Sequence, residues 1–218
     1  MKSWESSFPG MTFSHKRINA DIRGMAGFRK QRREVGRACG RQALFAAGYY
    51  YPEKDPLENS LGKGLLPAWP EGYIGSITYT NEYAFAAVAS DDTLSSVGID
   101  AEAIFAPSTL QTIEKFIASD NEYELYFNSL AYHLSKEEFF SIIFSAKESI
   151  YKCFSSLARN TRGFKDVEII SVDLEKCEFE YRLLCDLRHQ FVHGYVGKGF
   201  VEQQGENIFT MVQLQNLS

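Results

Sequence analysis

The 218-residue sequence predicts an α+β fold built from two similar halves, residues 1–105 and 106–218. A helical run and a group of short strands occupy the first half, and helical runs followed by a second group of strands occupy the other. This order lacks the strict alternation of strand and helix that is typical of a parallel α/β sheet. Since 44% of the residues are apolar and 14% are aromatic, the chain can bury a sizeable core, as one large domain or as two small ones.

In the first half, good helix formers fill residues 27–47 and predict a helix. The density of Pro, Gly and Asn in residues 49–70 then indicates an irregular connection. Three strand-like runs follow, at residues 73–78, 83–90 and 96–102. These runs favour a small mixed or antiparallel sheet.

The second half begins with helical patterns at residues 110–130 and 136–157. In the latter, aromatic and apolar residues recur at helical spacing and predict a buried face; they are Phe140, Phe144, Tyr151, Phe154 and Leu157. Four strand-like runs come next, at residues 167–174, 178–184, 191–195 and 208–214.

Several observations exclude a membrane or disulfide-rich class. No run of about eighteen apolar residues occurs, and the first residues lack the order of a secretory signal. We therefore expect a soluble protein of the cytoplasm, without membrane insertion. The four cysteines, Cys39, Cys153, Cys177 and Cys185, form no CxxC pair, which favours reduced and mostly buried thiols.

The charge is unevenly distributed along a chain whose net charge is −5. Nine of the 23 basic residues lie between Lys16 and Arg41, beside only Asp21 and Glu34, which makes this segment basic and the remainder strongly acidic. Four of its arginines follow each other at i, i+4 spacing and form one stripe of the predicted helix: Arg29, Arg33, Arg37 and Arg41. The stripe favours a compact polyanionic ligand over nucleic acid, although a solvated helix face remains an alternative.

Two acidic residues share one face of the strand at 96–102. Strand alternation sends Asp100 and Glu102 to the same side, while Ile99 points to the other. Adjacent like charges repel, so the pair invites a cation between them. The alternative is an exposed strand end with two solvated acids.

The helix at 136–157 carries a second charged group, formed by Lys147, Glu148 and Lys152. Glu148 and Lys152 are four residues apart on one face, and the simplest interpretation is a surface ion pair. If this face meets Asp100 and Glu102, the three carboxylates suit Mg²⁺. The lysines would then supply positive charge to phosphate oxygens.

These segments resemble the motifs of the 4'-phosphopantetheinyl transferases of the Sfp and enterobactin-synthase type. Residues 97–102 match the VGIDxE motif, and residues 144–152 match the (F/W)SxKExxxK motif. Trp69-Pro70 followed by residues 75–79 is similar to a third motif, WP…GSxSH. The resemblance implies two pseudo-symmetric α/β subdomains, each a small sheet packed with a long helix, with the active site in the cleft between them. It also implies a monomer that moves 4'-phosphopantetheine from coenzyme A to a serine of an apo carrier protein and releases 3',5'-ADP.

The resemblance assigns the charged residues as follows. Asp100, Glu102 and Glu148 would hold Mg²⁺, and Glu148 and Lys152 would be catalytic residues. Lys147 and Lys152 would contact the phosphates or the pantetheine arm of coenzyme A.

For the nucleotide end of coenzyme A, the resemblance implies contacts from Ser76, Arg29 and Arg37, with Arg41 a weaker candidate. Tyr79 stands where the family usually has a histidine that contacts the phosphates. A tyrosine can donate a hydrogen bond but carries no positive charge, so we expect somewhat weaker coenzyme A binding.

The resemblance also suggests a proton acceptor for the carrier serine. Glu122 is similar to a family glutamate with this proposed role, and Asp120 and Glu124 are close rivals. A metal-bound water is the alternative acceptor. The expected partners are peptidyl, aryl or acyl carrier domains, first of all those of siderophore-forming nonribosomal peptide synthetases. Two other functions stay open: a Mg-dependent nucleotide phosphohydrolase, and a non-catalytic carrier-binding subunit whose Tyr79 marks lost activity.

Overall fold

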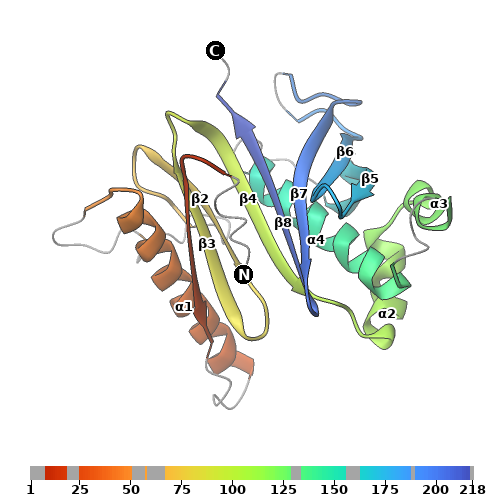
Figure 1. Ribbon diagram of the computed structural model, residues 1–218, viewed down its shortest axis with the longest axis horizontal. Coiled ribbons are helices and arrows are strands. Elements are labelled where there is room, and N and C mark those ends of the chain that lie inside the picture. Colours follow the sequence, from red (N-terminus) through yellow and green to blue (C-terminus); the bar gives the residue numbers. More distant parts are fainter. Residues whose placement is uncertain are drawn as a thin grey trace. The chain divides into compact units, whose positions relative to one another are not determined.

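The protein has two sheets, each packed against helices, which confirms the predicted α+β class (Figure 1). The computed structural model describes residues 8–18, 25–50, 57, 67–128, 134–155, 163–187 and 190–216. Contacts divide the chain into a first unit, Met1–Ile99 with Gln213–Ser218, and a second unit, Asp100–Val212. Among the described helices, none is long and apolar enough to cross a membrane.

The first unit contains a three-stranded antiparallel sheet and one long helix. Strands β1 (Met11–Arg17), β3 (Tyr83–Ser90) and β2 (Tyr73–Tyr79) lie side by side in that order. Helix α1 (Met25–Ala46) packs on all three strands. The prediction for α1, β2 and β3 is confirmed, whereas β1 was not predicted, because its seven residues mix polar and apolar side chains without clear alternation.

Small residues let α1 approach the first sheet closely. Ala84, Ala86 and Val88 of β3 are buried against Ala43 and Leu44 of α1. Alanine methyl groups leave room for the helix, so the larger leucine can fill the space between the layers.

The second unit begins with three helices, α2 (Pro107–Ile117), α3 (Asp120–Asn128) and α4 (Lys136–Ser155). The prediction of one helix at 110–130 is wrong, because Ala118 is extended and the chain restarts as α3. Glu122 and Ser119 form a capping box at this restart: the Ser119 N–H donates to the Glu122 carboxylate, and the Glu122 N–H donates to the Ser119 hydroxyl. The aromatic face predicted for α4 is only partly buried, since Tyr151 is 43% exposed, and its predicted member Leu157 lies outside the described residues.

The larger sheet has the strand order β4-β8-β7-β6-β5. Its strands are β4 (Leu94–Ala103), β5 (Val167–Asp173), β6 (Glu178–Leu183), β7 (Val196–Gln204) and β8 (Asn207–Gln215). The strand predicted at 191–195 is wrong: residues 192–195 form a turn, with Gly194 at φ 87°, and β7 starts only at Val196.

Two glycines explain why β7 was hard to recognise. Gly197 and Gly199 lie opposite Tyr181 and Phe179 of β6, and both aromatic side chains are almost fully buried. A Cβ atom on Gly199 would lie 2.1 Å from the Phe179 ring, and one on Gly197 would lie 2.4 Å from Tyr181. The rings therefore cover the glycines, and this packing requires residues that weaken the strand pattern.

We expect Gly199→Ala to lower the free energy of unfolding by about 1–3 kcal/mol, because the added methyl group must displace a buried phenylalanine ring. Denaturant titration measures this change. Lys198→Ala, on the same strand but at an exposed position, should change stability by less than about 0.5 kcal/mol. Equal stability of Gly199→Ala and the wild type would contradict the packing argument.

Candidate active site

Strand β4 delivers the two carboxylates of the predicted metal site. Ile99 and Ala101 are buried on one side of the strand, so Asp100 and Glu102 share the other side. Asp100 is itself only 6% exposed, whereas Glu102 is half-buried. A carboxylate buried this far needs partners for both oxygens.

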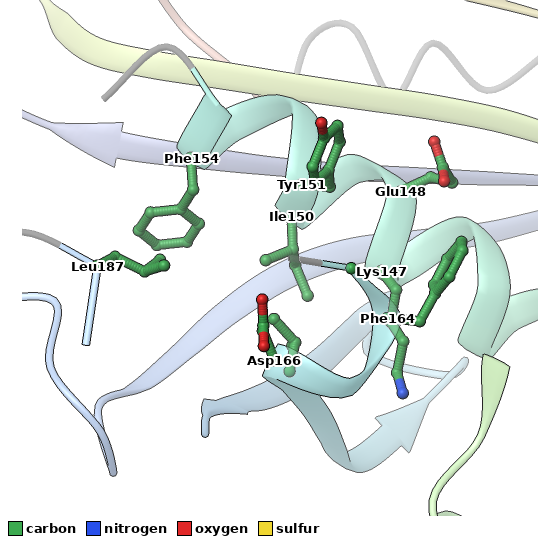
Figure 2. Close-up of a pocket in the computed structure, with 10 residues that line it drawn as sticks. Lys147, Glu148, Ile150, Tyr151, Phe154, Phe164, Asp166 and Leu187 are labelled. Atoms are coloured by element: carbon green, nitrogen blue, oxygen red, sulfur yellow. The ribbon is translucent and has the colours of Figure 1, made fainter. Parts of the chain in front are cut away.

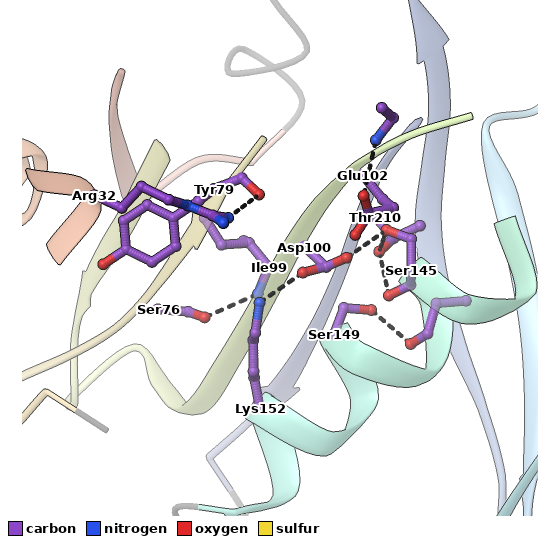
Figure 3. Close-up of polar contacts among 12 residues, drawn as sticks. Arg32, Ser76, Tyr79, Ile99, Asp100, Glu102, Ser145, Ser149, Lys152 and Thr210 are labelled. Atoms are coloured by element: carbon purple, nitrogen blue, oxygen red, sulfur yellow. Dashed lines mark hydrogen bonds and ion pairs between the residues drawn. The ribbon is translucent and has the colours of Figure 1, made fainter. Parts of the chain in front are cut away.

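Helix α4 supplies those partners (Figure 3). The Lys152 ammonium donates to Asp100 Oδ1 at 2.6 Å, and the Ser145 hydroxyl donates to Asp100 Oδ2 at 2.9 Å. Thr210 of β8 in turn donates to the Ser145 carbonyl at 2.8 Å. Asp100 is thus fixed by the same helix that carries Glu148.

Glu148 is electrostatically coupled to this pair. Burial raises the pKa of Glu148 above the usual range of a glutamate; Lys152 acts against this shift and Asp100 adds to it. Two neighbouring carboxylates in a partly desolvated place are stabilised by a cation. Lys152 supplies one positive charge there.

Asp100, Glu102 and Glu148 offer carboxylate oxygens, which are the ligands that a hard divalent cation such as Mg²⁺ prefers. Asp100 and Glu148 interact with each other, but the Glu102 Oε1 atom accepts a hydrogen bond from the backbone N–H of Ala103 at 3.2 Å. Within the residues that the structure describes, no three His, Cys, Asp or Glu side chains gather closely enough to hold one metal ion. The assignment of Asp100, Glu102 and Glu148 as magnesium ligands therefore stays a prediction.

The Lys147 side chain lies on a different side of α4 from the side chain of Glu148, its neighbour in the motif. Its side chain and that of Glu148 leave α4 in different directions (Figure 2). The Lys147 ammonium donates to Glu122 Oε2 at 2.8 Å and to the Ile117 carbonyl at 2.8 Å. Lys147 is 3% exposed and Glu122 is fully buried. Burial lowers the pKa of Lys147, while Glu122 opposes that shift.

Every oxygen of the Glu122 carboxylate has a donor. Oε2 accepts from the Ser119 N–H at 2.7 Å as well as from Lys147, and Oε1 accepts from the Ile169 N–H at 2.8 Å. The rival acids Asp120 and Glu124 on the same helix are exposed. Glu122 is thus the buried centre that connects α3, α4 and β5.

The residues predicted to contact the nucleotide lie in the first unit. Arg29 is exposed, and Arg37 and Arg41 are half-buried along α1. Ser76 is buried, and its hydroxyl accepts a hydrogen bond from the Ile99 N–H at 3.1 Å. Tyr79 lies against α1 and contacts Arg32, a residue that the sequence patterns did not single out.

A pocket of about 250 Å³ opens beside α4 in the second unit (Figure 2). Its lining includes Glu148, Tyr151 and Phe154 of α4, together with Phe164 and Leu187. The walls are mostly apolar, and the charged residues of the lining are Lys147, Glu148 and Asp166. Such a pocket suits a mostly apolar ligand that also carries a few polar groups.

Sequence reasoning missed two positioning side chains, Ser145 and Thr210. Ser145 is the serine of the (F/W)SxKExxxK motif, so its place in that motif was an available signal. Thr210 offered none, because it comes from a strand 65 residues away.

Glu122→Gln should lower the free energy of unfolding by about 3 kcal/mol or more, because the Lys147 ammonium would remain buried without a carboxylate. Thermal or denaturant unfolding monitored by circular dichroism measures the loss. Glu124→Gln, on the same helix but exposed, is the matched control and should be near neutral. If both variants unfold like the wild type, the ion pair does not stabilise the fold.

Ser145→Ala removes one hydrogen bond to a buried carboxylate, so we expect a stability loss of about 1–3 kcal/mol. Ser155→Ala, whose hydroxyl donates to the Lys152 carbonyl within α4, should lose less. The comparison uses the same unfolding measurement, and a larger loss in Ser155→Ala would contradict the proposed support of Asp100.

Two family profiles match the chain. The profile of the 4'-phosphopantetheinyl transferase superfamily matches residues 96–204, and the profile of the 4'-phosphopantetheinyl transferase N-terminal domain matches residues 19–89. The first match includes β4 with Asp100 and α4 with Glu148, and the second includes α1.

Curated relatives agree with these profiles. The 4'-phosphopantetheinyl transferase Npt of Nocardia iowensis is 32% identical over 144 residues, which cover 64% of this chain and 59% of the relative. The 4'-phosphopantetheinyl transferase Svp of Streptomyces mobaraensis is 30% identical over 155 residues, or 68% and 56% of the two chains. Enterobactin synthase component D of Salmonella austin is 31% identical over 112 residues, or 51% and 44%. The matched regions span about half the length of these relatives, and the chain belongs to the 4'-phosphopantetheinyl transferase superfamily.

Proposed function

We propose that this protein transfers the 4'-phosphopantetheine group of coenzyme A to a serine of an apo carrier protein and releases 3',5'-ADP. The observation that carries the proposal is the group formed by Asp100, Glu148 and Lys152, in which a buried carboxylate is fixed by a lysine beside a second, coupled carboxylate. Both the strand and the helix of this group lie in the segment that matches the superfamily profile. Relatives named as 4'-phosphopantetheinyl transferases support the same reaction.

The chain's own residues would act mainly by charge and position. Asp100, Glu102 and Glu148 would hold Mg²⁺, which when bound supplies positive charge to the pyrophosphate oxygens of coenzyme A. Lys152 would add charge to the same oxygens from the neighbouring turn of α4. Ser145 would keep the Asp100 carboxylate in a fixed orientation, since its hydroxyl bonds directly to Oδ2.

The buried pair of Lys147 and Glu122 would have a positioning role. Glu122 has no exposed surface and all its oxygens accept hydrogen bonds, which disfavours it as the acceptor of the carrier serine's proton. Lys147 is directed at Glu122, which favours Lys152 for the contact with phosphate. The pair would hold α4 in the place from which Glu148 acts.

The pocket beside α4 would receive the pantetheine arm. That arm is uncharged, and the pocket walls are mostly apolar next to Glu148. The exposed Tyr151 at this pocket offers both an aromatic face and a hydroxyl group to the arm.

The acceptor would be a peptidyl, aryl or acyl carrier domain in the cytoplasm. The similarity to enterobactin synthase component D favours the carrier domains of siderophore-forming nonribosomal peptide synthetases. We propose that the protein acts on them as a monomer.

The decisive experiment measures the intact mass of an apo peptidyl carrier domain after incubation with the protein, coenzyme A and Mg²⁺. We expect a gain of one phosphopantetheine group that disappears with EDTA. Asp100→Ala and Glu148→Gln should abolish the gain, because each removes one of the two coupled carboxylates. Glu180→Gln, at a site of the second unit far along the chain from these motifs, is the control that should retain it.

The same assay separates the rival functions. Release of 3',5'-ADP from coenzyme A without any carrier would indicate a phosphohydrolase. Binding of coenzyme A and carrier without any mass gain, across several carrier types, would indicate a non-catalytic carrier-binding subunit. Full activity of Asp100→Ala would contradict the assigned site.

A further inference from the structure

The Arg32 side chain is held in a defined place on the surface of the first unit. Its guanidinium carbon lies 5.2 Å from the centre of the Tyr79 ring and 5.7 Å from the centre of the Phe28 ring. Its Nη2 atom donates to the Tyr79 backbone carbonyl at 3.2 Å (Figure 3). A flat guanidinium held by two rings and a carbonyl loses less conformational freedom on binding a ligand than a free arginine does.

A glycine in α1 makes this arrangement possible. A Cβ atom on Gly36 would lie 2.4 Å from the Tyr79 hydroxyl, so no larger residue fits under the ring. Glycine in a helix interior costs about 0.5–1 kcal/mol relative to alanine. Gly36 therefore weakens α1 locally and in return lets the hydroxyl end of the Tyr79 ring approach the helix closely, with Arg32 beside the ring.

The positive charge of three arginines acts on Tyr79. Arg32, Arg37 and Arg33 all act to lower the pKa of the Tyr79 hydroxyl, against the raising effect of burial, which shows that their charges reach the ring. In the described part of the chain, no carboxylate lies within ion-pair distance of these three arginines. Lys30, on the same helix, faces Glu34 at 3.9 Å.

We propose that Arg32, oriented by Tyr79, binds a phosphate group at the nucleotide end of coenzyme A and supplies the positive charge that a histidine at position 79 would otherwise supply. The inference rests on the proposed function for the identity of the ligand. A guanidinium presents paired N–H groups that match phosphate oxygens. In this arrangement Tyr79 is a positioning residue and Arg32 is the residue that touches the ligand.

This inference and the sequence-based expectation differ in their consequences. If the absence of a histidine weakens binding, Tyr79→His should tighten coenzyme A binding. If Arg32 already supplies the charge, Tyr79→His should bring no gain, because it exchanges the ring that supports Arg32 for a smaller one.

The test is a calorimetric measurement of the dissociation constants for coenzyme A and 3',5'-ADP. We expect Arg32→Gln to weaken both by about tenfold or more, the effect of losing a charge-assisted hydrogen bond. Lys30→Gln removes the same charge from the same helix, and as the matched control it should change both by less than about twofold. Unfolding midpoints of all variants show whether each one is folded.

A second series tests the role of Tyr79. Tyr79→Leu removes the ring and should weaken binding, whereas Tyr79→Phe keeps the ring and should bind more tightly than Tyr79→Leu. Because both residues act through one contact, Arg32→Gln combined with Tyr79→Leu should lose less than the sum of the two single losses. An additive loss in a folded double variant would overturn the coupling.

The outcomes separate this inference from the proposed function. The inference is overturned if Arg32→Gln binds coenzyme A and 3',5'-ADP like the wild type, or if Lys30→Gln loses as much affinity as Arg32→Gln. In either case, carrier modification by the wild type still upholds the proposed function. Arg32-dependent binding of 3',5'-ADP by a protein that modifies no carrier upholds the inference and overturns the function. A wild type that binds neither nucleotide overturns both.

Discussion

The buried ion pair between Lys147 and Glu122 is the constraint on which the second unit depends. A lysine and a glutamate that are almost fully removed from water are costly unless each charge is matched and hydrogen-bonded. Here the carboxylate also receives the N–H groups of Ser119 and Ile169, and the ammonium also donates to Ile117. The pair thus provides hydrogen-bond partners for backbone groups at the end of α2, at the start of α3 and in β5. It also holds α4 against these elements.

Helix geometry explains how one short motif performs two tasks. At about 100° per residue, Lys152 lies about 40° from Glu148 around the helix axis, whereas Lys147 lies about 100° from Glu148 and about 140° from Lys152. The first lysine is therefore directed into the fold and the second toward Asp100. The side of α4 that faces Glu122 and the side that faces Asp100 are therefore both set by the same nine residues.

The sequence predicted what depends on local pattern and missed what depends on distant partners. The boundaries of α1, β2, β3 and β8 follow from residue types and periodicity within each segment. The break between α2 and α3 was missed, because Ala118 and Ser119 are compatible with a continuing helix until the Glu122 carboxylate caps α3. Strand β7 was also missed, because its glycines weaken the strand pattern and are explained only by the aromatic rings of β6 that pack over them.

The candidate site shows the same limit. The motifs identified Asp100, Glu148 and Lys152, and the structure brings these three together. Lys147 looked equivalent to Lys152 in the sequence, since nothing local distinguishes a lysine that faces a buried glutamate 25 residues earlier. Arg32 was overlooked for the opposite reason: it lies outside the i, i+4 stripe, and its position depends on a tyrosine 47 residues later in the chain.

Glycines under aromatic rings occur in both units, and the exposure of the ring separates their roles. On β7, Gly199 lies under Phe179, a ring with no exposed surface, so the close approach serves only the packing of the sheet. On α1, Gly36 lies under Tyr79, a ring that is half-buried and carries a guanidinium on its face. If packing alone were required there, an alanine on the helix with a smaller strand residue would fill the same space without weakening α1. The combination of a helix-weakening glycine, a half-buried ring and an oriented cation supports the proposal that Arg32 binds a phosphate group.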